Sequence, residues 1–75
     1  MDKELKTFCD DLLDELLAAR KAAGLTQEQV AERMGTKQTS IARLETGLTS
    51  GNLPSMTMLQ KYARAVGKKL QIRLV

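Results

Sequence analysis

The sequence contains no histidine and no tryptophan, and only one residue each of cysteine, proline, phenylalanine and tyrosine. The absence of histidine removes the most common general base and the most common metal ligand. A single cysteine, Cys9, can form neither an intrachain disulfide nor a zinc site, and we interpret it as a small buried hydrophobe. No glycine-rich phosphate loop is present. These absences predict a protein that is not an enzyme and that has no metal or other cofactor.

Long apolar runs are missing as well. The uninterrupted apolar stretches are only a few residues long, so we expect neither a signal peptide nor a membrane span. With a single cysteine and no such segment, we expect a protein of the reducing cytoplasm. A chain of 75 residues, 43% of them hydrophobic, allows one domain with a small core. A second copy of the chain would help to stabilise a core of this size.

Charge is divided unevenly along the chain. Residues 1–19 carry six acidic and two basic residues, which gives a net charge of −4. Residues 20–75 carry ten basic and three acidic residues, which gives a net charge of +7. A basic body is expected to attract a polyanion such as DNA, while the acidic arm stays away from it. The commoner role of such acids, a solvated helix face, remains the alternative for the arm.

Two longer segments flank the centre of the chain. Apolar residues at a spacing of three and four, from Leu5 to Leu17, predict a long helix over about residues 3–23. Its second half is expected to pack on the rest of the chain. Its first half needs other cover, which the C-terminal segment, a second copy or a partner could provide. Pro54 is expected to open a further helix over about residues 55–66.

The central stretch, residues 27–46, predicts two short helices joined by a turn. Thr26 is a favourable N-cap, and Gln29 completes a capping box three residues later. Gly35 is expected to end the first helix, because glycine adopts the left-handed conformation at little steric cost.

The second helix of this stretch has one apolar and one polar face. Ile41 and Leu44 share the inward face, and Gly47 is expected to end the helix. The outward face is short, polar and basic. Two short helices joined by a glycine-containing turn are typical of a helix-turn-helix, whose second helix enters the major groove of DNA. The spacing by itself fits an ordinary helical hairpin equally well.

A family resemblance favours the first of these two interpretations. The run GLTQEQVAERMGTKQTSIARLETG, residues 24–47, closely resembles the Xre/Cro-type helix-turn-helix family of bacterial and phage repressors. The shared features are the Thr-Gln start, the small Ala31, the turn Gly35, the Gln-x-Ser-Ile core and a late Leu-Glu pair. Thr36 departs from the pattern, since many members have an apolar residue there. The resemblance covers roughly residues 16–66 and implies a mainly α, lambda-repressor-like helical domain.

The resemblance also implies a DNA-reading surface on the second helix. We expect Gln38 to read a base, because its amide can form a bidentate pair with adenine. Arg43, one turn further, can reach guanine O6 and N7 or a phosphate. Lys37 and Thr39 are expected at a base edge or a thymine methyl group. Gln27 resembles the phosphate-contacting glutamine of the family.

Other residues are expected to position the DNA or to brace the domain. Ser40 and the backbone around Ser50 to Asn52 are further candidates for phosphate contacts. Each of these groups has an alternative role as a solvated surface residue. The resemblance implies that Arg20 and Glu45 form an ion pair that braces the first helix against the recognition helix, since a free acid there would repel phosphate.

The end of the chain changes period. In KKLQIRLV the apolar residues Leu70, Ile72 and Leu74 alternate with polar ones, which predicts a β-strand over about residues 68–74 with one apolar face. The backbone groups of a lone strand need partners, and the simplest partner is the same strand of a second copy, antiparallel across a two-fold axis. An Xre-type domain followed by such a strand is similar to the HigA-type and HipB-type antitoxins, in which these strands help to form the dimer.

The sequence therefore predicts a homodimeric transcriptional repressor, and most simply the antitoxin of a type II toxin–antitoxin pair that represses its own operon. The expected partners are double-stranded operator DNA with an inverted repeat, a second copy of the chain and a cognate toxin, without a membrane. The expected location is the cytoplasm, at a bacterial or phage nucleoid. One alternative is a stand-alone regulator of the phage or restriction-controller type. Another is a protein-interaction module that works through its acidic N-terminal helix.

Overall fold

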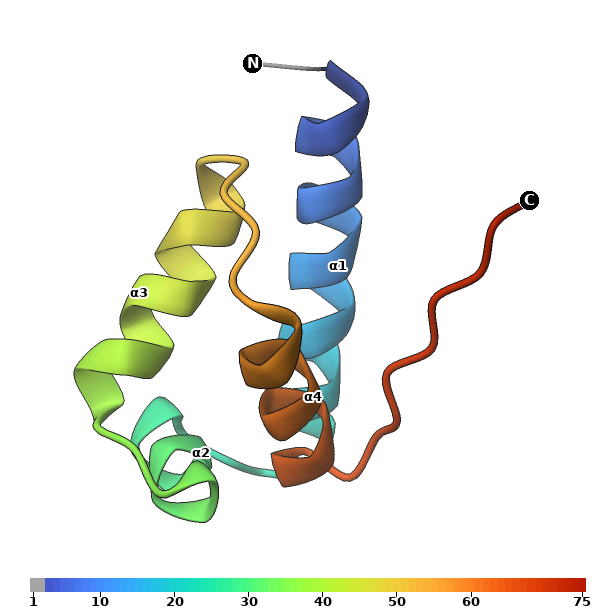
Figure 1. Cartoon of the computed structure of the whole chain (residues 1–75). Coiled ribbons are helices and arrows are strands. Elements are labelled where there is room, and N and C mark those ends of the chain that lie inside the picture. The colour runs from blue at the N-terminus through green and yellow to red at the C-terminus, as the bar shows by residue number, and fades with distance from the viewer. Residues whose placement is uncertain (1–2) are drawn as a thin grey trace.

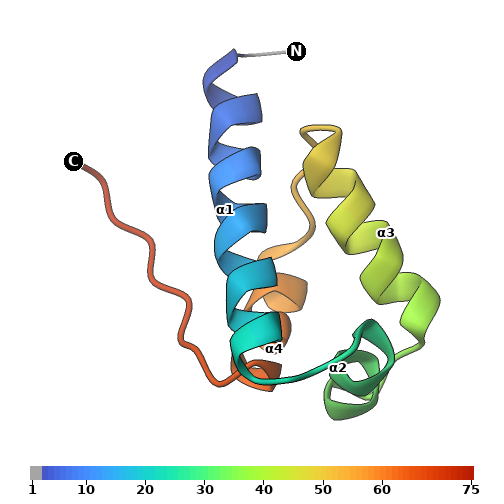
Figure 2. The same cartoon turned by 180° about the vertical axis from the view of Figure 1, so that it is seen from behind.

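The computed structural model of the protein describes residues 3–75, which form four helices. Helix α1 spans Lys3–Ala22, α2 spans Gln27–Met34, α3 spans Gln38–Thr49 and α4 spans Met56–Ala65. Figures 1 and 2 show α1 and α3 on two sides of the molecule, with α2 and α4 towards the end where the long α1 finishes. The segment after α4 runs along the other side of α1 from α3. The fold is thus mainly helical, as the sequence predicts.

Local hydrogen bonds explain where the helices begin and end. The predicted capping box is confirmed, with Gln29 N donating to Thr26 Oγ1 at 3.1 Å and Thr26 N donating to Gln29 Oε1 at 2.9 Å. Gly35 ends α2 with φ at 68°, in the left-handed region that glycine adopts without a Cβ penalty. Ser55 caps α4 by accepting a hydrogen bond from Met58 N.

The core lies where the four helices meet. Helix α2 packs against α3 and α4, and α1 packs against α3. Burial of Cys9 confirms its interpretation as a small core residue. No helix among residues 3–75 is both long enough and apolar enough to cross a membrane. The buried residues that form the central cluster are Cys9, Leu16, Val30, Ala31, Ile41, Leu44, Leu48, Leu59, Tyr62, Ala65 and Val66.

The expected end of the second short helix is wrong. Helix α3 continues through Gly47 to Thr49, and Ser50 forms its C-terminal cap. Leu48 is fully buried, and burying a leucine side chain contributes about 1.5–3 kcal/mol. A glycine inside a helix costs only about 1 kcal/mol relative to alanine. Packing therefore outweighs the local preference of Gly47, and the chain turns instead at Gly51, whose φ is 82°.

The C-terminal segment is extended in this single copy. No strand is assigned in the part of the chain that the structure describes. Leu70 is partly buried, whereas Ile72 is 59% exposed and Leu74 is 99% exposed. A strand over residues 68–74 needs a pairing partner, so the strand and its dimer stay predictions.

Candidate nucleic-acid interface

The polar face at the start of α3 is open to solvent. Lys37, Gln38, Thr39 and Arg43 are exposed, and Ser40 is half-buried. They occupy this face because Ile41 and Leu44, on the opposite side of the helix, are anchored in the core. The predicted base-reading residues are therefore accessible at the start of α3, on the sides of the helix that are not in the core.

The N-terminus of α3 differs from that of α2. Lys37 is the N-cap residue of α3, and its side chain makes no capping hydrogen bond. The first turn of α3 contains no acidic residue, whereas that of α2 contains Glu28. The first backbone N–H groups of a helix lack intrahelical acceptors, and the helix dipole adds partial positive charge at this end. The start of α3 is consequently suited to an anion.

A chain of side-chain amides orients Gln38. Gln38 Nε2 donates to Gln27 Oε1 at 3.2 Å, and Gln27 Nε2 donates to Glu45 Oε1 at 2.8 Å. Because Glu45 is a carboxylate, it accepts from Gln27 and so sets the direction of the Gln27 amide. Gln27 is thus held between the core and the exposed Gln38, and its own Nε2 retains one further N–H.

Glu45 is almost completely buried, at 8% exposure, and it joins helices α1, α2 and α4 to α3. Besides Gln27, the Tyr62 hydroxyl donates to Glu45 Oε2 at 2.7 Å. Arg20 Nε lies 3.4 Å from the same oxygen, so the structure places the two predicted partners next to each other. The contact is an ion pair without a hydrogen bond, since Arg20 Nε has no hydrogen-bond acceptor among the described residues. Arg20 Nη1 donates instead to the carbonyl of Leu25 at 3.1 Å.

Tyr62 is the member of this network that sequence reasoning missed. Tyr62 is fully buried on α4, where its position in the sequence indicates no more than a core residue. Burial, together with its hydrogen bond to the Glu45 carboxylate, raises the pKa of the Tyr62 hydroxyl well above its usual value. A buried tyrosine hydroxyl normally finds a polar partner, so an inward-facing tyrosine is itself a signal that a polar group lies nearby.

The remaining phosphate candidates fall into two places. Ser40, Arg43 and Asn52 line one shallow hollow of about 260 Å³ beside α3. Ser50 lies at the other end of α3 from Gln38, about 18 Å away along a helix of this length. The backbone N–H groups of Ser50 and Asn52 donate to carbonyls of α3. The expectation that this loop offers its backbone is therefore wrong, because the end of the helix uses those donors.

The chemistry gathered at the start of α3 is that of hydrogen bonding. Amide, hydroxyl, ammonium and guanidinium groups are the groups with which proteins contact base edges and phosphates. Within residues 3–75, no group of three histidine, cysteine, aspartate or glutamate residues is placed to hold a metal ion.

Comparison with known proteins agrees with this geometry. Residues 16–72 match the helix-turn-helix family. The chain belongs to the Xre-type helix-turn-helix family. Among its relatives, the antitoxin HigA1 of Mycobacterium tuberculosis is 38% identical over 63 residues, which are 84% of this chain and 40% of the antitoxin. This Xre-type chain thus spans well under half the length of that relative.

Two further relatives of this Xre-type chain carry regulatory names. An uncharacterized HTH-type transcriptional regulator of Methanothermobacter thermautotrophicus is 44% identical over 50 residues, 67% of this chain and 68% of the relative. Another one, of Haemophilus influenzae, is 38% identical over 61 residues, 81% of this chain and 59% of the relative. No solved structure matches the chain significantly.

Proposed function

We propose that this Xre-type chain is a sequence-specific DNA-binding protein that represses transcription as a homodimer. The observation that carries the proposal is the exposed Gln38, held by Gln27 at the uncapped start of α3. One N–H of the Gln38 amide goes to Gln27. The second N–H and the Oε1 atom remain, and these are the donor and acceptor that adenine N7 and N6 require in the major groove.

The neighbouring residues complete this proposed interface. Lys37 and Thr39 extend the base-reading face, and Arg43 reaches a guanine or a phosphate. Gln27 keeps one N–H for a phosphate after its bond to Glu45. Ser40 adds a hydroxyl at the edge of the same helix. Asn52 and Ser50 contribute only side chains, the former from the hollow that it shares with Arg43.

Dimerisation by the C-terminal segment would give the protein two recognition helices. Leu70, Ile72 and Leu74 would form the apolar face of a strand that pairs antiparallel with its copy. Exposure of Ile72 and Leu74 in the single chain supports this assignment. A two-fold symmetric dimer requires an inverted repeat in the operator.

Similarity to an antitoxin supports a narrower role. The 38% identity to HigA1 favours an antitoxin that binds a cognate toxin and represses its own operon. Such a protein would act in the cytoplasm, at the nucleoid. Co-purification of the chain with the product of the neighbouring gene tests this role. Repression of the operon promoter without any such partner would instead identify a stand-alone regulator.

Selection of bound sequences from a random DNA pool tests the DNA-binding proposal. We expect an inverted repeat to be enriched, and Gln38→Ala should weaken binding to it by about 1–3 kcal/mol with little change on random DNA. Gln60→Ala is the matched control, because Gln60 is an exposed glutamine on α4, outside this face. Equal losses on both DNAs would mean that Gln38 only positions the backbone.

A further inference from the structure

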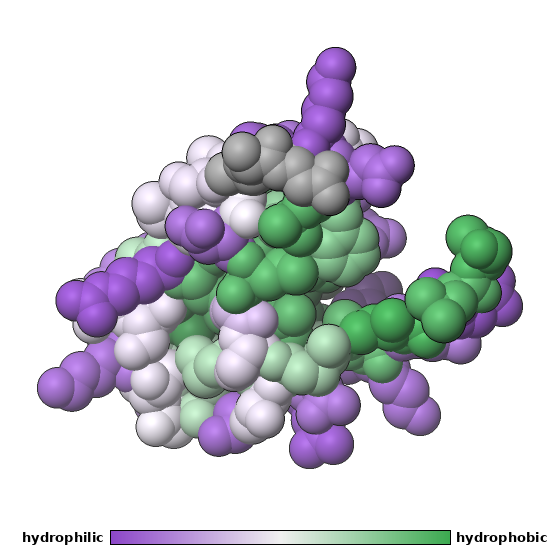
Figure 3. All heavy atoms as spheres, turned by 45° about the horizontal axis from the view of Figure 1, so that its top comes forward, coloured by the Kyte–Doolittle hydropathy of each residue, from purple (hydrophilic) through white to green (hydrophobic). Residues whose placement is uncertain are grey.

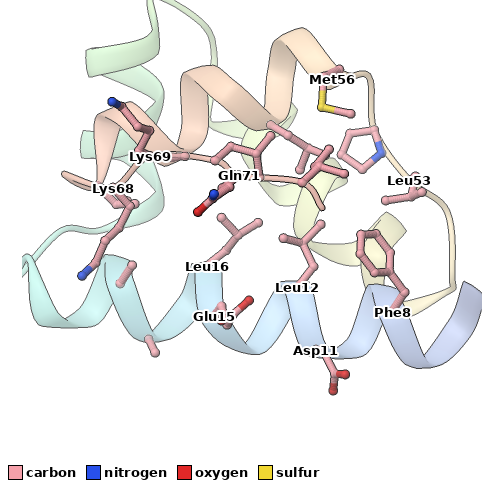
Figure 4. A pocket seen from close by; sticks show the side chains of 18 of the residues that line it. Phe8, Asp11, Leu12, Glu15, Leu16, Leu53, Met56, Lys68, Lys69 and Gln71 are labelled. Carbon is pink, nitrogen blue, oxygen red and sulfur yellow. The ribbon is translucent and has the colours of Figure 1, made fainter. Parts of the chain in front are cut away.

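A broad groove separates α1 from the C-terminal segment. It has a volume of about 1070 Å³, and Figure 4 shows Phe8, Leu12 and Leu16 pointing into it from α1. Leu53 and Met56 line it from the connection to α4 and the start of that helix. The C-terminal wall of the groove lies on the other side of α1 from α3, and no residue of α3 lines the groove.

Four of the exposed large hydrophobic residues, Phe8, Leu53, Met56 and Ile72, line the groove. Figure 3 shows hydrophobic surface beside the start of α1 and along the projecting C-terminal segment. Exposed apolar surface that is contiguous in this way marks an interaction site. The exposed large hydrophobic residues of the described chain are Leu5, Phe8, Leu53, Met56, Ile72, Leu74 and Val75.

The two long walls of the groove carry opposite charges. Asp11 and Glu15 lie on the α1 side, and Lys68, Lys69 and Arg73 lie on the C-terminal side. All five side chains are exposed. Between residues 3 and 75, none of the five takes part in an ion pair. A ligand that satisfies both walls must itself carry a basic strip and an acidic strip at a matching separation.

We propose that the occupant is a second copy of this chain, with the C-terminal segment of each protomer seated in the groove against α1 of the other. Lys69 and Arg73 of one protomer then face Asp11 and Glu15 of the partner subunit. Each contact occurs twice in a two-fold symmetric dimer, because both protomers use the same surface. This arrangement rests on the proposed homodimer and specifies which surfaces of the two copies meet.

The exposure of the C-terminal segment favours a second copy, rather than the segment's own protomer, as the partner that covers its apolar side. The segment lines its own groove, yet Ile72 remains 59% exposed and Leu74 remains 99% exposed. In a β-strand, Leu70, Ile72 and Leu74 would project to one side. Seating that side on the partner's α1 covers it, and leaves the backbone edge of the segment free to pair with its copy.

Charge reversal on each wall tests the arrangement. One variant carries Asp11→Lys with Glu15→Lys, and the other carries Lys69→Glu with Arg73→Glu. Sedimentation without DNA should show a wild-type dimer, and about a ten- to hundredfold weaker dimer for each variant alone, because like charges then face each other. An equimolar mixture should recover the wild-type dimer affinity, since both contacts of the mixed dimer again join opposite charges. Native mass spectrometry identifies that mixed dimer.

Matched controls separate this effect from a general change of charge. Asp14→Lys lies on α1 outside the groove, and Lys61→Glu lies on α4 outside it. Both should dimerise like the wild type, and thermal unfolding should show that all variants fold.

Three outcomes would overturn the arrangement, namely a monomeric wild type, charge variants that dimerise normally, or a mixture that fails to recover. Pairing within one chain predicts the last of these, because mixing cannot repair an intramolecular contact. The DNA-binding proposal is judged separately by binding to the selected sequence. A normal dimer without specific DNA binding would count against that proposal, and not against the seating of the C-terminal segment.

Discussion

At the scale of single residues, Glu45 connects the recognition helix to the other three helices. A buried carboxylate is costly unless charged and hydrogen-bonding groups surround it. Here Tyr62 and Gln27 donate to it, and Arg20 lies 3.4 Å away. Because Gln27 in turn accepts from Gln38, the same carboxylate that stabilises the fold also orients the proposed base-reading amide.

Replacement of Glu45 tests this double role. Glu45→Ala leaves the Arg20 charge and the Tyr62 hydroxyl without their partner, so we expect the free energy of unfolding to fall by about 2–4 kcal/mol. DNA affinity should fall as well, because Gln27 loses its anchor. Urea denaturation and a DNA titration measure the two effects, with the exposed Glu32→Ala as the control. A loss of affinity at unchanged stability would contradict the bracing role.

Tyr62 makes the stability of the protein depend on pH in the alkaline range. The pKa of Tyr62 is raised in the folded protein, chiefly by burial and then by its hydrogen bond to Glu45. Above about pH 10, the ordinary pKa of tyrosine, the unfolded chain releases this proton while the folded chain retains it. Ionisation of Tyr62 thus favours the unfolded state. The contribution of the protonated Tyr62 hydroxyl to the free energy of unfolding therefore declines as the pH rises above about 10.

Tyr62→Phe should remove this part of the pH dependence. At neutral pH we expect the variant to be less stable by about 1.5–3 kcal/mol, because a hydrogen bond to a charged group is lost. The difference in the free energy of unfolding between the variant and the wild type should become smaller as the pH rises above about 10. Denaturation of both proteins at pH 7, 9 and 11 measures it. A constant difference would show that the hydroxyl proton is not retained by the fold.

At the scale of elements, the length of α3 decides where the chain turns towards α4. Leu48 holds the last turn of α3 in the core. The Asn52 backbone N–H then donates to the Gly47 carbonyl at 2.7 Å, which returns the chain alongside the helix. This return places Asn52 next to Ser40 and Arg43. A helix that ended at Gly47 would not bring these groups together.

Two glycines offer a paired test of the helix ends. A Cβ on Gly47 would lie 3.5 Å from the Asn52 carbonyl oxygen, an ordinary van der Waals distance. Gly47→Ala should therefore raise the free energy of unfolding by about 0.5–1 kcal/mol, since alanine favours the helix. Gly35→Ala should lower it by about 1–2 kcal/mol, because φ at Gly35 is 68°. Thermal unfolding compares the two, and destabilisation by Gly47→Ala would place the end of α3 at residue 47.

At the scale of the whole molecule, the proposed DNA and dimer surfaces are separated. Helix α3 and the C-terminal segment lie on different sides of α1 (Figures 1 and 2). Two acids of α1, Asp11 and Glu15, line the groove, and no acidic residue lies in the first turn of α3. Negative charge is thereby kept away from the phosphates that the basic face would approach.

The proposed dimer should bind DNA through phosphate contacts and with two-fold symmetry. Its affinity should fall linearly with salt on logarithmic axes, because phosphate contacts release counterions. Half-site centres should lie about 10–10.5 base pairs apart, or a multiple of this. Titration at several salt concentrations and footprinting of the selected operator measure both. Protection of a single unpaired half-site would contradict the symmetric dimer.

The sequence by itself determined the features that depend on neighbours a few residues away. The capping box of Thr26 and Gln29, the turn at Gly35 and the apolar stripes of the helices follow from contacts within one or two turns. The family resemblance pointed to Arg20 and Glu45 as partners. No local pattern could give their geometry, because the two residues are distant in the chain.

Tertiary structure alone decided the rest. Burial of Leu48 extended α3 past Gly47, and Tyr62, 17 residues from Glu45, supplied a donor that no local spacing could reveal. The backbone donors at Ser50 and Asn52 turned out to serve the end of α3. In each case the contact that decides the structure joins different elements or depends on how the chain packs after a helix ends. The free energy of such a contact depends on packing that only the folded molecule provides.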